Sequence, residues 1–412
     1  MDSGERGNDV EISLALGVGG VLALGISWLA GLLLAKAGFR LPDPTRRLGH
    51  IDGLRGYLAL LVFLSHYVLW TRHLALGIEW GVGPDPMLAL GQVPVAIFFM
   101  ITGLLFYPKA RDGFGATDWR AFLISRVFRI YPLALLSIVI VVAMLWWRSG
   151  FTTDPWVLAK TVFNLARWVA FIDQPRLFGV ADSWMANAGV FWTLTSEWLF
   201  YLAVLPAIAL ARSATREALP GWTTPLWALG AALVLRFTWS GQADLMLHFM
   251  FGMFILELRN RGKFSAFFQR TDVAILSVAL MVMAVFCLPP PIRDRTVMFY
   301  APFFACVACG QSFRGLLSNA GSVVLGEVSF GIYVLHGIVL WFGMSLCEDL
   351  VVARPVAATI MLLPVFALCT VALAAVAHVL VERPMIELGR RAARSRRRPW
   401  PIFWGDKRLA SD

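Results

Sequence analysis

The sequence predicts an all-α polytopic membrane protein with about eleven transmembrane helices, the N-terminus outside the cell and the C-terminus in the cytoplasm. Apolar residues make up 58% of the 412 residues and charged residues only 15%, with a mean hydropathy of +0.70. Soluble globular domains carry charge at about 25% of positions, so this composition excludes that class. The apolar runs are nearly continuous rather than alternating, which favours helices over a β-barrel.

The apolar runs recur along the whole chain with no long polar block between them. Three of the predicted spans are shorter than the ~20 residues of a full crossing, so they would be tilted, extended or incomplete. Between the fourth and fifth spans, residues 155–172 mix apolar and polar positions, which predicts an amphipathic helix at the membrane surface. The predicted spans are 12–37, 53–72, 87–107, 131–149, 190–211, 224–239, 244–258, 273–289, 297–311, 323–346 and 356–381.

Positive charge in the loops indicates the orientation. With eleven spans, the loops after the first, third and seventh spans lie on the same side as the C-terminus, and all three are basic. The positive-inside rule places this side in the cytoplasm. The net charge of +10 is therefore no sign of a nucleic-acid partner, and the tail Arg390–Arg398 is expected to contact anionic lipid. The basic loop residues are Arg40, Arg46 and Arg47; Lys109, Arg111, Arg120, Arg126 and Arg129; and Arg259, Arg261, Lys263 and Arg270.

The chain divides into three predicted parts. Residues 1–49 hold a polar tail, an extra span and a basic loop; 50–388 form the membrane domain; and 389–412 are a basic cytoplasmic tail. No metal site is predicted, because Cys306 and Cys309 form a CxxC without a second pair and are interpreted as buried apolar residues. The preference for Arg over Lys suggests a GC-rich bacterial genome, and hence the bacterial cytoplasmic membrane.

The stretch Ile51–Trp70 is a predicted span that carries two ionisable residues, Arg55 and His66. At about 100° per residue their spacing returns both side chains to one helix face, about 16 Å apart along the axis. Ionisable groups inside a span are costly and usually mark function. Arg55 at the entrance of a pocket and His66 at its floor would hold a long anionic ligand and perform proton chemistry. From this helix alone, a snorkelling Arg and a structural His explain the pattern equally well.

Two more arginines, Arg126 and Arg129, precede the fourth predicted span at the same membrane face as Arg55. Three guanidinium groups at one face would bind phosphates, because Arg forms paired hydrogen bonds with them. Positive-inside anchoring is the alternative explanation for Arg126 and Arg129.

Two further ionisable residues, Glu197 and His336, lie at a predicted depth similar to that of His66. A carboxylate in hydrocarbon is costly unless it is paired, so we expect a partner for Glu197 on another helix. If that partner is His66, Glu197 orients the imidazole and favours its use as a general base. Tyr333 lies one turn before His336 on the same face, and for this pair a structural and a substrate-binding role are both open.

The third predicted span contains Thr102 next to Gly103, with Pro94 further up the helix. A kinked helix with a small polar patch is one interpretation, and close helix packing is the other. After the last span, Glu382 and Pro384 are interpreted as structural, with Glu382 paired to a cytoplasmic Arg and Pro384 ending the helix.

Six motifs occur in a fixed order: DGLRG with Arg55 and His66, FFMITGLLF, RVFRIYP, FWTLTSEWLFY, FGIYVLH and VERP. Together they resemble the motifs of acyltransferase family 3, a family of integral-membrane acyltransferases, and the resemblance covers about 50–385. Three positions depart from the family pattern: Thr102 stands where Ser is usual, Leu104 where Phe is usual, and Trp198 where a second Glu is common.

The resemblance implies transfer of an acyl group, most often acetyl, from acyl-CoA to a hydroxyl. Acceptors in the family are typically sugars of surface polysaccharides, glycolipids or glycosylated small molecules. Arg55, Arg126 and Arg129 would bind the CoA phosphates from the cytoplasm. The pantetheine arm would carry the thioester to His66, which would deprotonate the acceptor hydroxyl or accept the acyl group itself.

The resemblance also implies roles for the remaining polar residues. Glu197 would orient His66 or contact the acceptor, and the candidates for substrate contact are Thr102, Tyr333 and His336. The first span is extra to the usual ten of the family.

A proton-coupled transporter of a small organic acid or sugar is the alternative from another functional class, with His66 and Glu197 as the proton relay. It does not explain why arginines cluster at one face of a domain with a deep His, and no internal repeat supports it.

Overall fold

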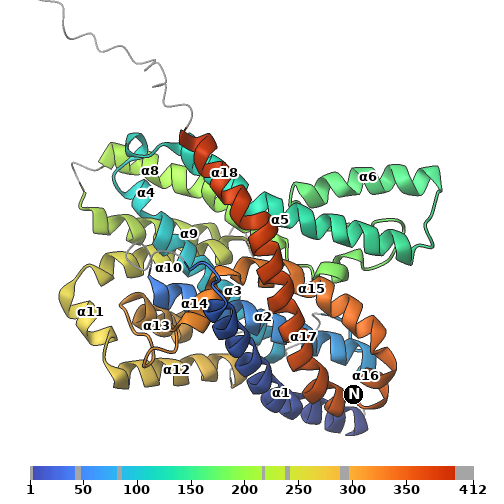
Figure 1. The fold of residues 1–412 in the computed structure, drawn as a ribbon. Coiled ribbons are helices and arrows are strands. Elements are labelled where there is room, and N and C mark those ends of the chain that lie inside the picture. The colour runs from blue at the N-terminus through green and yellow to red at the C-terminus, as the bar shows by residue number, and fades with distance from the viewer. Residues whose placement is uncertain are drawn as a thin grey trace, which may run out of the picture.

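The structure is a computed structural model that describes residues 3–41, 48–80, 86–215, 219–236, 242–287 and 297–394. Arg46, Arg47 and the tail from 395 onward lie outside the described residues. Within the described part the protein is all-helical and contains no strand, as predicted (Figure 1). The elements are α1 (Ser3–Lys36), α2 (Gly49–Leu76), α3 (Pro86–Phe106), α4 (Pro108–Arg111), η2 (Phe114–Ala116), α5 (Trp119–Arg148), α6 (Pro155–Val169), η3 (Ser183–Asn187), α7 (Trp192–Leu199), η4 (Phe200–Val204), α8 (Leu205–Thr215), η5 (Gly221–Thr223), α9 (Thr224–Arg236), α10 (Gln242–Arg259), α11 (Gly262–Phe268), α12 (Thr271–Phe286), α13 (Val297–Ala308), α14 (Ala320–Glu327), α15 (Ser329–Leu346), α16 (Glu348–Ala353), α17 (Pro355–Ala377), η7 (His378–Glu382) and α18 (Arg383–Arg394).

Seven helical segments in the described residues are long and apolar enough to cross a membrane. The pair α11 and α12, bent by 68°, makes an eighth if it counts as one span. The runs that the sequence marks as short form α9, α10 and α13, with 13, 18 and 12 residues. The number of eleven spans and the orientation of the termini stay predictions. The seven segments are Glu11–Lys36, Gly49–Leu76, Met87–Phe106, Trp119–Arg148, Trp192–Thr215, Ser329–Leu346 and Pro355–Arg394.

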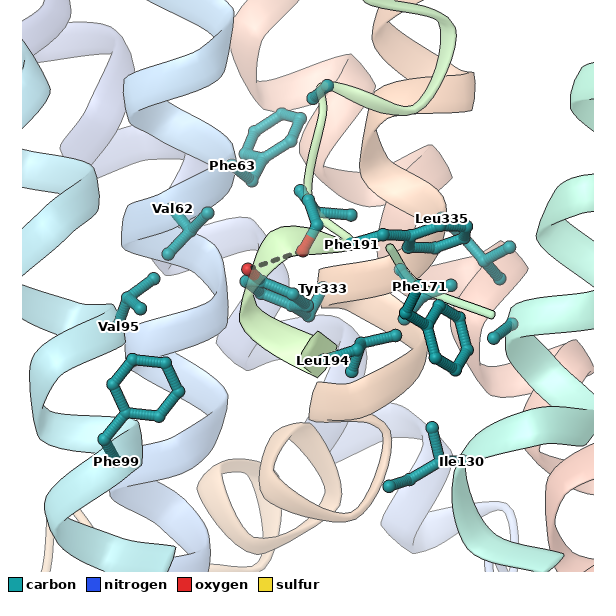
Figure 2. Close-up of a cluster of buried hydrophobic side chains, with 14 of the residues drawn as sticks. Val62, Phe63, Val95, Phe99, Ile130, Phe171, Phe191, Leu194, Tyr333 and Leu335 are labelled. Atoms are coloured by element: carbon teal, nitrogen blue, oxygen red, sulfur yellow. Dashed lines mark hydrogen bonds between the residues drawn. The ribbon is translucent and has the colours of Figure 1, made fainter. Parts of the chain in front are cut away.

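The helix α2 lies at the centre of the fold. It packs against α3, α14, α15 and α17, while α1 lies along α17 on the outside (Figure 1). The largest hydrophobic cluster joins α2, α3, α5 and α15, and includes Val62, Phe99, Ile130 and Leu335 (Figure 2). Such close-packed side chains fix the relative positions of the helices that carry the polar residues.

The helix α6 runs beside α5 and is amphipathic, as predicted for 155–172. Its polar residues Thr161 and Asn164 face inward, where they bind the backbone N–H of Phe178 at 2.8 Å and the carbonyl of Arg176 at 2.7 Å. Its apolar face is exposed, with Trp156 at 86% of full accessibility.

The two glycines of DGLRG allow α2 to touch α14 and the loop before it, backbone to backbone. A Cβ atom on Gly56 would lie 2.6 Å from the Cβ of Leu325 and 2.8 Å from the amide nitrogen of Gly326, and one on Gly53 would strike the carbonyl of Leu317. Only a residue without a side chain fits there. This contact fixes the rotation of α2 about its axis, and with it the direction of Arg55.

The third span is a continuous helix, α3, with Pro94 inside it. A Cβ on Gly103 would strike the carbonyl of Phe249 on α10, and a Cβ on Gly252 of α10 would strike the carbonyl of Met100. Of the two interpretations of this span, close helix packing is therefore the one that the contacts of Gly103 support.

Replacing Gly56 with leucine is expected to destabilise the protein by about 1–3 kcal/mol, because overpacking forces α2 away from α14. The measurement is thermal unfolding of the purified protein in detergent. Gly25→Leu on α1 is the matched control, since nothing lies within 4 Å of a Cβ at Gly25. Equal melting temperatures for the two variants would show that the α2–α14 contact is not tight.

Candidate active site

A cavity of about 680 Å³ opens among α2, α3, α5, α7, α15 and α18. Its size lies within the usual range for cofactor and ligand sites, roughly 300–1,000 Å³. The structure brings most of the predicted site residues together here, although they come from five different helices. Six of the eight predicted residues line it: Arg55, Thr102, Arg126, Arg129, Glu197 and Tyr333.

Four arginines line this cavity, and two of them have acidic partners. The guanidinium of Arg55 is 3.6 Å from the carboxylate of Asp52, one turn earlier on α2. Arg129 of α5 forms an ion pair with Glu382 and lies over the ring of Phe330, 5.6 Å from its centroid. Both arginines are half-buried, so these pairs hold the charges in place inside the protein.

The other two arginines, Arg126 and Arg390, have no acidic partner among the described residues. Arg126 lies 4.7 Å from the centroid of the Phe106 ring and 6.0 Å from that of Tyr201. Guanidinium groups stack on aromatic faces and still keep their N–H donors in one plane for a ligand. The cavity is thus lined by two guanidinium groups that form no ion pair among the described residues.

The pair of Arg129 with Glu382 is part of a buried polar cluster in the π-helical turn η7. The side chain of Glu382 is fully buried, and Nδ1 of His378 is 2.9 Å from its second oxygen. Nε2 of His378 is 3.9 Å from Glu327 on α14. The expected pairing of Glu382 with an Arg is confirmed, and its partner is one of the predicted anion-binding residues. The expectation that Pro384 ends the helix is wrong, because the helix continues through α18 to Arg394.

Glu197 accepts a hydrogen bond from the hydroxyl of Tyr201, which is fully buried. The expectation of a partner on another helix is wrong, because Tyr201 lies one turn further along the same span, in the π-helical turn η4. Glu197 and Arg126 therefore both contact Tyr201, and all three residues line the cavity.

The two histidines do not line the cavity but contact each other. Nε2 of His336 on α15 is 3.1 Å from Nδ1 of His66 on α2. The centroids of the two imidazole rings lie 5.0 Å apart. The ring of Trp80 stacks on that of His66, with 5.9 Å between their centroids. The similar depth predicted for the two histidines is confirmed by this contact. His66 is therefore paired with His336 and not with Glu197, whose partner is Tyr201.

The hydrogen bonds of this pair determine the tautomer of each ring. Nδ1 of His66 is 3.0 Å from the carbonyl of Val62, and Nδ1 of His336 is 3.1 Å from that of Ile332. Since a carbonyl only accepts, each Nδ1 carries the proton. Nε2 of His336 then accepts from His66. Nε2 of His66 is left with a lone pair and no partner among the described residues.

Tyr333 marks the end of the cavity nearest the histidines. Its hydroxyl bonds to Thr193 at 2.9 Å and to the carbonyl of Val190 at 3.3 Å. Its ring is 6.2 Å from that of His336, one turn further along α15. The cavity is thus lined by arginines and by Tyr333. Beyond Tyr333 lies His336, and His336 contacts His66, whose Nε2 has no partner among the described residues.

The lining residues that were not predicted as site residues include Tyr201, Asp52 and Arg390. Tyr201 has a signal in the sequence, since it lies four residues after Glu197 and so on the same helix face. Asp52, three residues before Arg55, has the same kind of signal. Arg390 has none, because it is the first of several arginines in a basic run.

The described residues contain no group of three His, Cys, Asp or Glu side chains that could hold a metal ion. Cys306 on α13 and Cys309, just after the end of that helix, are both buried, in agreement with their interpretation as apolar residues.

Comparison with known proteins gives one family and one relative. The sequence model described as "Acyltransferase domain" matches residues 48–379. The chain is 25% identical over 396 residues to the protein named acyltransferase MdmB from Streptomyces mycarofaciens, covering 85% of this chain and 95% of that one. No solved structure matches the chain significantly. Together with its long apolar helices, this match shows that the chain belongs to acyltransferase family 3 and supports an integral membrane protein.

Proposed function

We propose that the protein is a membrane O-acyltransferase that moves an acyl group, with acetyl as the expected one, from acyl-CoA to a hydroxyl of a sugar-containing acceptor. The acceptor classes are a surface polysaccharide, a glycolipid or a glycosylated small molecule, and the expected location is the bacterial cytoplasmic membrane. The observation that carries the proposal is the cavity lined by four arginines and by Tyr333, whose ring is 6.2 Å from that of His336. His336 in turn contacts His66, whose Nε2 has no partner among the described residues.

The arginine end of the cavity would bind the phosphates of CoA. A phosphate gains most from guanidinium groups that have no other anionic partner, and Arg126 meets this condition. Arg55 and Arg129 would add positive charge while their own partners hold them in place. The pantetheine arm would then extend past Thr102 and Tyr333, the predicted substrate contacts that line the cavity.

The thioester end would react at His66. Its Nε2 takes the proton of the acceptor hydroxyl as the hydroxyl oxygen attacks the thioester carbonyl, the C–S bond breaks, and the CoA thiolate leaves with the proton. In a two-step version, Nε2 attacks the thioester carbonyl first, the C–S bond breaks, and the CoA thiolate leaves. The acceptor oxygen then attacks the acyl carbon, the C–N bond breaks, and the proton of the hydroxyl passes to Nε2. His336 would serve in both by holding His66 in the reactive tautomer. Glu197, bonded to Tyr201, would contact the substrate from the cavity wall.

The proposal is tested with purified protein and radiolabelled acetyl-CoA. We expect saturable binding of the donor, release of CoA, and transfer of the label to a mixed lipid and glycan extract. If the wild-type protein binds no acyl-CoA at any concentration tested, the proposal fails, and proton-coupled transport of organic acids and sugars becomes the function to assay.

Replacing Arg126 with glutamine is expected to weaken acetyl-CoA binding about 10- to 100-fold. A hydrogen bond to a charged group contributes about 1.5–3 kcal/mol, and about 1.4 kcal/mol corresponds to a factor of ten. Equilibrium binding of labelled donor measures the effect. Arg148→Gln, at the other end of α5 and exposed, is the control. Equal binding by both variants would remove Arg126 from the donor site.

A further inference from the structure

We propose that the C-terminal helix α18 forms part of the donor site, and that Arg390 binds the 3′-phosphate of CoA at the mouth of the cavity. The inference rests on the proposed function and adds a residue and a subsite to it. The basic run that contains Arg390 would otherwise be explained by contact with anionic lipid headgroups alone.

The packing of α18 explains why Arg390 faces the cavity. This helix continues α17 through the π-helical turn η7 and lies against α5. A Cβ on Gly389 would lie 2.5 Å from the Cβ of Phe128, so the two helices touch at this glycine. Ile386 and Arg390 are one turn apart on one face, and both line the cavity. Arg391 and Arg394 do not line it.

Charge makes Arg390 available for an anion. The nearest acid along the helix that could pair with it, Glu387, is 3.3 Å from Arg383. Arg390 has no ion-pair partner among the described residues, although it borders a cavity with three other arginines. Like charges repel, and the repulsion is relieved when an anion enters. A phosphate group therefore fits this end of the cavity.

The order of burial identifies which phosphate Arg390 meets. Arg55, Arg126 and Arg129 are half-buried, whereas Arg390 is exposed and so lies at the opening. In CoA the pyrophosphate lies between the pantetheine arm and the adenosine, and the 3′-phosphate lies on the ribose beyond it. With the thioester directed to His66, the pyrophosphate would reach the inner arginines and the 3′-phosphate the outer one.

The test compares CoA with 3′-dephospho-CoA in nanodiscs made only of phosphatidylcholine. Wild-type protein is expected to bind CoA at least about tenfold more tightly than dephospho-CoA. Arg390→Gln is expected to lose this preference, with CoA binding about tenfold weaker and dephospho-CoA binding unchanged. Arg391→Gln is the matched control, because it removes the same charge from the next residue, and it should keep the wild-type preference.

The outcomes separate this inference from the proposed function. If the wild-type protein binds neither ligand, the proposed function fails. If the wild type binds CoA, the inference is overturned when Arg390→Gln behaves like Arg391→Gln, or when it weakens both ligands equally. The same measurements with phosphatidylglycerol in the nanodiscs address the lipid source. If that lipid displaces CoA from the wild type but not from Arg390→Gln, Arg390 binds a lipid phosphate and the assignment to CoA is wrong.

Discussion

Replacing His66 with glutamine is expected to lower the rate of acyl transfer by about 10²- to 10⁴-fold, the range that positioned general bases contribute. Glutamine keeps a polar side chain of similar size but has no basic nitrogen. His66 does not line the arginine-rich cavity, so the affinity for acetyl-CoA should stay within about twofold of the wild type. A large fall in rate without a change in donor binding would place His66 at the reacting atoms.

The rate is measured as CoA release and as label transfer, at saturating donor. His73→Gln is the control, because His73 lies two turns further along α2 and its Nδ1 bonds to the carbonyl of Ile78 at 3.2 Å. If the His66 variant keeps more than about a tenth of the wild-type rate, the general base lies elsewhere. If it loses donor binding as well, His66 supports the fold or the donor site, and the division of roles proposed here is wrong.

Much of the site could be predicted from local spacing. Arg55 and His66 share a helix face by simple periodicity, and Arg126 and Arg129 are one turn apart at the start of a long span. Charged groups in apolar segments are costly enough to stand out, and this draws attention to Glu197. Glu382, at the end of the last predicted span, is expected to pair with an arginine. In the structure Glu197 is bonded to Tyr201 and Glu382 is paired with Arg129, and both of these partners line the cavity.

The contacts between distant segments could not be predicted. His66 and His336 are 270 residues apart, and their similar depth says nothing about whether their helices are neighbours. For Glu197, the rule that a carboxylate needs a partner is sound. The choice of another helix was wrong because the π-helical turn η4 places Tyr201 close enough.

The number of spans illustrates a different limit. Hydropathy identifies α9, α10 and α13 as apolar but does not distinguish a short crossing from a helix packed within the domain. The same holds for 323–346, which is divided at Val328 into α14 and α15. There the break allows Gly326 to meet the backbone of Asp52 on α2, a requirement of packing that no pattern of apolar residues records.

The polar cluster around Glu382 gives the largest expected effect on stability. Replacing Glu382 with glutamine is expected to lower the free energy of unfolding by about 3–5 kcal/mol, because it leaves Arg129 opposite a neutral group inside the protein. The side chain of Glu382 is fully buried and that of Arg129 is 19% exposed, so water compensates only in part. Unfolding in detergent, followed by tryptophan fluorescence, measures the change.

The control and the double variant decide whether the ion pair is the cause. Glu387→Gln, on the exposed face of α18 and paired with Arg383 at i, i+4, is expected to cost about 0.5 kcal/mol at most. If the charge left unpaired causes the loss, Arg129→Gln combined with Glu382→Gln should be more stable than the sum of the two single losses predicts. Strict additivity would show that the two side chains act independently. In that case Glu382 would not be what holds Arg129 at the cavity wall, and the position of Arg129 would have to come from its contact with Phe330.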